Sequence, residues 1–179
     1  MSNSQPNTDT GVSRLSFRAL DILDLNRYLT LATVDPEFDV WTSPVWYAFD
    51  KELNLFFNSP VDTRHTRNIK ANQAVAFAIF NSTERPEVVD GIQARGKASE
   101  LSTEADVRHA IQCYYARRYP DSGRRLNVDA RLAKYISGPR RFFVVKIDEA
   151  FVVDLTPNVA DARVLIPLSD IRDQLKSSG

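Results

Sequence analysis

The apolar residues of this chain are grouped in short runs of strand length, separated by turn residues. The longest unbroken run, Ala74 to Phe80, is far too short to span a membrane. Turn signals such as Asp35-Pro36 and Asp50-Lys-Glu52 separate the other runs. This pattern predicts an α+β domain that is mainly antiparallel, with about six strands forming a barrel and two or three helices between them.

The segments can be placed along the chain from their patterns. Two hairpins are expected, formed by Val40–Phe49 with Leu53–Phe57 and by Phe142–Ile147 with Phe151–Leu155. Other strands are expected at Leu31–Val34, Ala74–Phe80 and Val88–Leu101. The last apolar segment, Val164–Leu168, is followed by an expected polar helical end. Helices are expected at 15–28, at 63–72, from Ser102 or Thr103 to Pro120, and at Asp129–Ile136. The polar residues 1–13 predict a disordered tail, and residues 14–179 a single domain.

Two residues restrict the backbone inside expected strands. Pro44 cannot donate a ladder hydrogen bond, so it predicts a bulge or an edge strand. Gly96 lies within another strand, where glycine marks a β-bulge or a close approach of two backbones, or else plain curvature of the barrel.

The charges of the 179-residue chain cancel, with 23 basic and 23 acidic side chains and a pI near 6.7. A binder of nucleic acid or of membrane surfaces usually carries a net basic field, so we expect neither partner. One cysteine and two histidines exclude an internal disulfide and a conventional zinc site, and we expect no metal. The polar start of the chain does not resemble a secretory signal, which predicts a cytoplasmic protein.

The segment after Pro60 combines a turn with the start of a helix. Arg64, His65 and Arg67 fall in the first turn of that helix, where the helix dipole disfavours positive charge. Free amides, the Thr63 hydroxyl and two guanidinium groups would together hold a phosphate at this position. The alternative interpretation is a basic face exposed to solvent.

The strand at Thr42–Phe49 is rich in aromatic residues. Trp46, Tyr47 and Phe49 beside Pro44 would line a slot for a flat heteroaromatic ligand, with backbone groups near the proline free to bind it. The alternative is that these aromatic residues belong to the core, as most do.

The residue sets of well-known catalytic sites are missing from the sequence. There is no GxGxxG, Walker or GxSxG motif, and no catalytic acid or base stands out. Cys113 lies within an expected helix and is interpreted as a structural thiol. A second basic cluster, Arg117 to Arg125, would bind a phosphate or a partner, or lie in solvent.

Taken in order, four segments resemble the pyridoxamine 5′-phosphate oxidase-like superfamily, the FMN-binding split β-barrels. They are LTLATVD, SPVWYAFD with ELNLFFNS, TRHTRNI and QARGKASEL. The resemblance runs from about Leu25 to Leu101 and more weakly to Leu155. It implies a Greek-key split barrel with peripheral helices, FMN as cofactor, and a homodimer with the flavin at the subunit interface.

The resemblance also implies which residues bind the flavin. The ring would lie along Thr42, Ser43, Pro44, Val45, Trp46 and Tyr47, near Phe57 and Asn58. The helix start would hold the phosphate through Thr63, Arg64 and His65, with Arg67 and Asn68 in the same turn. A family glutamine on the later strand corresponds to Gln93.

Two departures from the oxidase pattern bear on the substrate. Tyr47 replaces a lysine that binds the substrate phosphate, and Arg163–Pro167 only partly matches the C-terminal Arg-Leu-x-Pro signature. We therefore expect an FMN-binding oxidoreductase that acts on a small molecule other than pyridoxamine phosphate. A deazaflavin-dependent reductase, and a haem or flavin carrier or sensor without turnover, are the alternatives.

Overall fold

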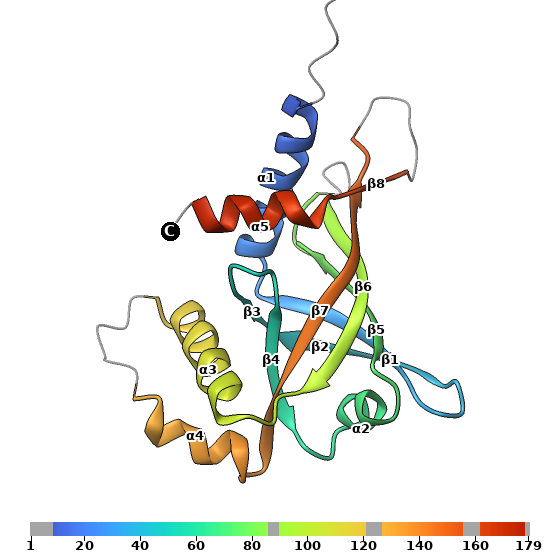
Figure 1. The fold of residues 1–179 in the computed structure, drawn as a ribbon. Helices are drawn as coiled ribbons and strands as arrows, with labels where there is room; N and C mark the ends of the chain where they lie inside the picture. The colour runs from blue at the N-terminus through green and yellow to red at the C-terminus, as the bar shows by residue number, and fades with distance from the viewer. Residues whose placement is uncertain (1–8, 86–89, 121–126, 156–161, 178–179) are drawn as a thin grey trace, which may run out of the picture.

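The computed structural model describes residues 9–85, 90–120, 127–155 and 162–177. Within them, eight strands form one antiparallel sheet in the order β2-β1-β5-β6-β7-β4-β3, with β8 paired to β7. The strands are β1 Tyr28–Val34, β2 Val40–Trp46, β3 Ala48–Phe49, β4 Leu55–Pro60, β5 Ala74–Phe80, β6 Gly91–Glu100, β7 Arg140–Val153 and β8 Arg163–Leu165. The sheet curls into an α+β split barrel, as predicted, although it has more than the six strands expected (Figure 1).

Five helices surround the sheet in the described part of the chain. They are α1 Asp9–Leu25, α2 Arg64–Ala71, α3 Glu104–Arg118, α4 Asp129–Ile136 and α5 Leu168–Ser177. Helices α1 and α5 lie at one end of the barrel, α2 lies at the other, and α3 and α4 flank the side formed by β3, β4 and β7 (Figure 1). The helices therefore cover the two ends and one side of the curled sheet.

Strand β7 is buried on both of its faces in its first half. Phe143 and Val145 point into the barrel, where they join the main apolar cluster. Phe142 and Val144 point outward into a second cluster with side chains of α3 and α4. Because both faces exclude water, this strand reads as a continuous apolar run instead of an alternating one.

The prediction of a closing hairpin around Asp148-Glu149 is wrong, because β7 is one strand of 14 residues. Arg95 pairs with Glu149 and Gly96 pairs with Ile147, so Asp148 is an extra residue in the ladder. The two acidic residues therefore mark a β-bulge, and Glu149 forms an ion pair with Arg95 across the strands, at 2.9 Å.

Gly96 sits beside this bulge, as the close-approach interpretation predicted. A Cβ atom on Gly96 would lie 2.1 Å from the backbone oxygen of Lys146. No side chain fits in that space, so the glycine is needed for the two longest strands to stay paired through the bulge.

The first expected hairpin is only partly correct. The segment Val40–Phe49 breaks at Tyr47, whose amide donates to the Arg27 carbonyl at 3.3 Å. Before the break β2 pairs with β1, and after it β3 pairs with β4 over two residues. Pro44 lies in β2, an end strand of the sheet, which confirms the edge position expected for it.

The helix boundaries mostly follow the sequence signals. Thr103 caps α3, with its Oγ1 accepting from the Asp106 amide at 3.1 Å. Helix α4 begins and ends where predicted. Helix α1 begins at Asp9, inside the segment expected to be a disordered tail, while the prediction for residues 1–8 lies outside the described residues.

Replacing Gly96 with alanine should destabilise the fold. The new methyl group forces β6 and β7 apart at the bulge, and overpacking of this kind costs about 1–3 kcal/mol. Urea denaturation of Gly96→Ala should show this loss in the free energy of unfolding. The control is Lys97→Ala, which alters the neighbouring exposed residue and should change stability by less than about 0.5 kcal/mol.

Candidate functional site

Strands β2, β1, β5 and β6 share an outer face lined by small or polar side chains that are exposed or half-buried. We call it the open face, and its residues are Thr30, Ala32, Thr42, Pro44, Ala76, Ala78, Gln93 and Arg95. The opposite side of the same strands carries the large core residues, such as Leu31 and Phe77. Alternation along the strands thus separates a packed inner face from an outer face of small or polar side chains.

The strand register places three predicted site residues together on the open face. Pro44, Thr30, Ala78 and Gln93 form one row across four strands, and Thr42 lies in the next row. Three strand spacings separate Pro44 from Gln93, or roughly 14 Å. Residues almost fifty positions apart in the sequence therefore face the same surface.

The remaining β2 residues do not lie on this surface to the same degree. Ser43 and Val45 are buried and point into the barrel. Trp46 is partly buried and packs edge-on against Tyr114 of α3, with ring centroids 4.4 Å apart. The predicted ring slot thus keeps Thr42 and Pro44, with Trp46 at its margin.

Tyr47 belongs to the core. Its side chain is fully buried, and its hydroxyl donates to the Leu23 carbonyl at 2.7 Å. Burial raises the pKa of Tyr47, and the Arg117 guanidinium lies 4.9 Å from its ring centroid. Arg117 also donates to the Leu23 carbonyl at the end of α1, so this group joins three elements and has no face for a ligand.

The two predicted residues of β4 differ in role. Phe57 is buried in the core and stacks on Phe143, at 5.2 Å between ring centroids. Asn58 is half-buried on the outer side, where its Oδ1 accepts from Arg140 Nε at 2.8 Å. The contact with Asn58 therefore places the Arg140 guanidinium at the end of β4, which the sequence did not predict.

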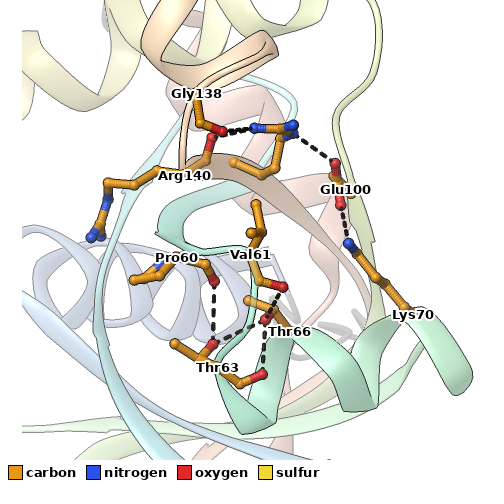
Figure 2. A network of polar contacts seen from close by, with 9 residues as sticks. Pro60, Val61, Thr63, Thr66, Lys70, Glu100, Gly138 and Arg140 are labelled. Atoms are coloured by element: carbon orange, nitrogen blue, oxygen red, sulfur yellow. Dashed lines mark hydrogen bonds and ion pairs between the residues drawn. The ribbon is translucent and has the colours of Figure 1, made fainter.

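The start of α2 is held by a compact hydroxyl network, shown in Figure 2. Thr63 Oγ1 lies 3.0 Å from Thr66 Oγ1, and Thr66 is fully buried against the Val61 carbonyl. The Thr63 side chain makes no capping bond to the helix amides. The first amides of α2 are therefore available to an anion.

Helix α2 is also tied to the sheet by charge. Glu100, at the end of β6, pairs with Lys70 of α2 at 3.2 Å and with Arg141 of β7 at 3.1 Å. Figure 2 shows Lys70 and Glu100 meeting, while the Arg140 side chain points away from them. The hydroxyl network thus holds the start of α2, and the ion pair with Glu100 holds its last turn.

Arg64 extends from α2 toward the turn between β1 and β2. Its guanidinium forms a hydrogen bond and ion pair with Asp39, lies 3.7 Å from Asp35 Oδ2, and stacks over Trp41 at 4.7 Å from the ring centroid. A third of its side-chain surface remains exposed. The predicted phosphate ligand is therefore present at the surface with two carboxylates beside it.

The His65 side chain is buried. The residue is only 9% exposed, and its Nε2 lies 2.8 Å from Ser59 Oγ and 3.2 Å from Thr63 Oγ1. Burial lowers the pKa of His65, so the ring is a neutral structural group here. The role expected for His65 at the phosphate stays a prediction.

The last two residues predicted at the helix start also differ. Asn68 is buried and donates from Nδ2 to Thr33 Oγ1 at 3.2 Å, which links α2 to β1. Arg67 is exposed and donates to the Asp62 carbonyl. Arg67 is therefore the second cation near the uncapped amides.

Gln93 lies at the rim of a cavity of about 350 Å³ between β5, β6 and β8. Arg163 Nε donates to Gln93 Oε1 at 3.0 Å. Ala78, Phe80 and Ile92 contribute apolar walls. The structure thus brings the predicted glutamine together with Arg163, the first residue of the partial C-terminal signature.

Cys113 and His109 of α3 lie away from the open face. Burial raises the pKa of the Cys113 thiol to about 11, which fits the structural role expected for it. Its neighbour His109 pairs with Asp50 at 3.0 Å.

In the described ranges, His, Cys, Asp and Glu side chains form no group of three or more suited to a metal ion. Among these same residues, none of the helices combines the length and apolar character that crossing a bilayer requires.

Asp35, Asp39 and Arg140 were not predicted as site residues from the sequence. The acidic turn was recognised only as a turn, because nothing in the local sequence shows that it folds against Arg64, 25 residues later than Asp39. The contact between Arg140 and Asn58 joins residues 82 positions apart. Both contacts arise from strand pairing and helix placement, which the local pattern does not specify.

With this geometry established, comparison with known proteins identifies the class. The family model for pyridoxamine 5′-phosphate oxidase matches residues 18–154, and the chain belongs to that family. A UPF0306 protein of Yersinia pestis bv. Antiqua (strain Angola) is 31% identical over 106 residues, covering 56% of this chain and 71% of the relative.

Two solved structures share the fold. One, from Clostridium acetobutylicum, is a protein related to general stress protein 26 in the pyridoxinephosphate oxidase family. It is 9% identical with a TM-score of 0.61, over 89% of this chain and 98% of that one. The other is the heme storage protein HutZ from Vibrio cholerae, which is 19% identical with a TM-score of 0.57, over 74% and 90% of the two chains.

His65 predicts a pH dependence of stability. Its pKa in the folded chain lies below the unfolded value near 6.5, so in acid the unfolded state binds a proton that the folded state resists. The free energy of unfolding should therefore fall as pH decreases from about 6.5, by at most about 1.4 kcal/mol per pH unit for one proton.

His65→Gln should have a shallower pH dependence than the wild type between pH 6.5 and 5 in urea denaturation. His109→Gln is the control, since that histidine is half-exposed and paired with Asp50. Equal slopes for the wild type and His65→Gln would contradict the buried neutral histidine.

Proposed function

We propose that the chain binds FMN on the open face and acts as a flavin-dependent oxidoreductase on a small molecule. The observation that carries this proposal is the combination of an exposed sheet surface of small or polar side chains with an uncapped helix start beside it. Thr42 and Pro44 leave room for a planar ring. The amides of α2 with Arg64 and Arg67 suit a phosphate. Membership of the pyridoxamine 5′-phosphate oxidase family supports the same ligand class.

The residues of this chain would have distinct roles toward FMN. Arg64, Arg67 and the first α2 amides would bind the phosphate, and the backbone of β2 would contact the ring. Thr66, His65 and Asn68 are buried behind that surface and would keep the helix start in place. FMN, when bound, supplies the redox chemistry, and the protein supplies orientation and the surrounding charges.

We further propose that a second copy of the chain covers the open face. Large apolar side chains at its margins are exposed, with Tyr28 at 58%, Val40 at 64% and Phe80 at 51%. Exposed apolar surface around a flat sheet is typical of an interface. In a twofold dimer the same patch pairs with itself, so the cavity at Gln93 and Arg163 would lie on the interface as well.

The buried Tyr47 supports a substrate other than pyridoxamine phosphate. At this position the oxidase has a lysine that binds the substrate phosphate, whereas the Tyr47 hydroxyl is already bonded to the Leu23 carbonyl. A neutral, fully buried phenol provides no positive charge for a second phosphate. The substrate therefore differs from pyridoxamine phosphate in its charge or shape.

The haem alternative has less support. The chain has two histidines, and the Nε2 atoms of both are engaged, His65 with Ser59 and His109 with Asp50. Neither is presented as a free axial ligand.

A deazaflavin would use the same phosphate contacts as FMN, so parallel titration with both flavins distinguishes them.

Removing the charge of Arg64 should weaken FMN binding by about 10- to 150-fold, because a charge-assisted hydrogen bond contributes about 1.5–3 kcal/mol. Riboflavin, which lacks the phosphate, should bind Arg64→Gln and the wild type equally. The measurement is fluorescence titration with each flavin. Arg108→Gln, on α3, is the matched control and should bind FMN like the wild type.

Failure of the wild-type protein to bind FMN or a deazaflavin would overturn the proposal. If FMN and riboflavin were weakened equally by Arg64→Gln, the phosphate would be bound elsewhere.

Placing a charge in the middle of the open face should separate the two copies. Ala76→Glu adds a carboxylate to an exposed position, so the monomer should still fold while the proposed interface acquires two like charges. Sedimentation velocity should show a dimer for the wild type and a monomer for Ala76→Glu.

The matched control is Ala130→Glu on α4, which is exposed away from the open face and should remain dimeric. A wild-type monomer at all protein concentrations, or a dimeric Ala76→Glu, would contradict the proposed interface.

A further inference from the structure

The turn between β1 and β2 is organised to present a carboxylate to Arg64. Asp35 Oδ1 accepts from the amides of Glu37 and Asp39, at 3.0 and 2.9 Å. Phe38 has a φ of 66°, a left-handed conformation that phenylalanine rarely adopts. These contacts fix the turn locally, and Asp39 then meets the guanidinium of Arg64 directly.

Arg64 is therefore occupied before any ligand arrives. Its guanidinium pairs with Asp39, has Asp35 Oδ2 at 3.7 Å, and is stacked on Trp41. A carboxylate and a phosphate oxygen offer a guanidinium the same kind of charge-assisted hydrogen bond. An incoming phosphate must consequently replace Asp39 or share Arg64 with it.

We propose that Asp39 is a built-in competitor for Arg64, which lowers the affinity of the phosphate end of the site. This inference rests on the proposed FMN site and describes the regulation of that site. When a phosphate binds, Arg64 exchanges the Asp39 carboxylate for the phosphate, and the acidic turn is released. The strength of the internal ion pair then determines how readily the flavin is retained.

The exposure of the two partners determines how large the effect is. The Arg64 side chain is 33% exposed and that of Asp39 is 64% exposed, so the pair is largely hydrated. Such pairs contribute little in water, and their loss corresponds to a change of about two- to fivefold in affinity. The effect should shrink as salt rises, because screening weakens the competing pair.

Glu37 provides a matched control within the same turn. It is exposed and carries the same charge, while Arg64 is paired with Asp39 and Asp35. Glu37→Gln therefore removes one negative charge from the neighbourhood without freeing Arg64. Any general electrostatic attraction of FMN to a less acidic turn appears in this variant too.

The experiment is fluorescence titration of wild type, Asp39→Asn and Glu37→Gln with FMN and with riboflavin, at low and high salt. Asp39→Asn should bind FMN about two- to fivefold more tightly at low salt and riboflavin as the wild type does. Glu37→Gln should change FMN affinity by less than Asp39→Asn. In an Arg64→Gln background, Asp39→Asn should have no effect on FMN affinity, since the competed group is gone.

The outcomes separate this inference from the proposed function. If FMN binds and Arg64→Gln weakens it, but Asp39→Asn and Glu37→Gln behave alike, the competitor role is wrong and the FMN site stands. The same holds if Asp39→Asn tightens riboflavin as much as FMN. If none of the proteins binds FMN, both the site and its regulation are overturned.

Discussion

A curled sheet has two faces to cover, and the helices of this chain cover only part of the outer one. The inner face is closed by the barrel core, and the outer face of β3, β4 and β7 is covered by α3 and α4. This arrangement depends on β7 running unbroken through its bulge beside Gly96, which keeps β6 joined to the half of the sheet that contains β4. What remains uncovered, among the residues that the structure describes, is the open face, an outer surface of small or polar side chains beside the start of α2.

Helix α2, next to that face, is tied to its surroundings near both of its ends. Thr66 and Asn68 are buried and bonded to neighbouring segments, and Lys70 is tied to Glu100. The cations that could meet an anion are the ones left at the surface, Arg64 and Arg67. The carboxylates of Asp35 and Asp39, in the turn between β1 and β2, lie against the Arg64 guanidinium and partly neutralise its charge. The backbone of α2 is held in place by these contacts, while the positive charge at its start depends on the ion pair of Arg64. Such a site suits a single phosphate better than a polyanion.

Much of the fold followed from local patterns, because β5, α3 and α4 carry clear apolar spacing and capping signals. The patterns failed where tertiary pairing decided the outcome. Asp148-Glu149 looks like a turn but is accommodated as a bulge, since Arg95 on the facing strand pairs with Glu149. For the site, the family resemblance predicted Thr42, Pro44, Arg64 and Gln93, and the structure places all four at least partly at the surface. It could not show that His65 and Tyr47 point inward, because side-chain direction depends on hydroxyl and carbonyl partners elsewhere in the chain.

We propose that one flavin binds per chain on a face shared by two copies. Sedimentation of the purified protein with FMN, followed through the visible absorbance of the flavin, tests both parts together. The flavin is expected to sediment with a dimer at one FMN per chain. Flavin that stays unbound while the protein sediments, or that travels with a monomer, would contradict it.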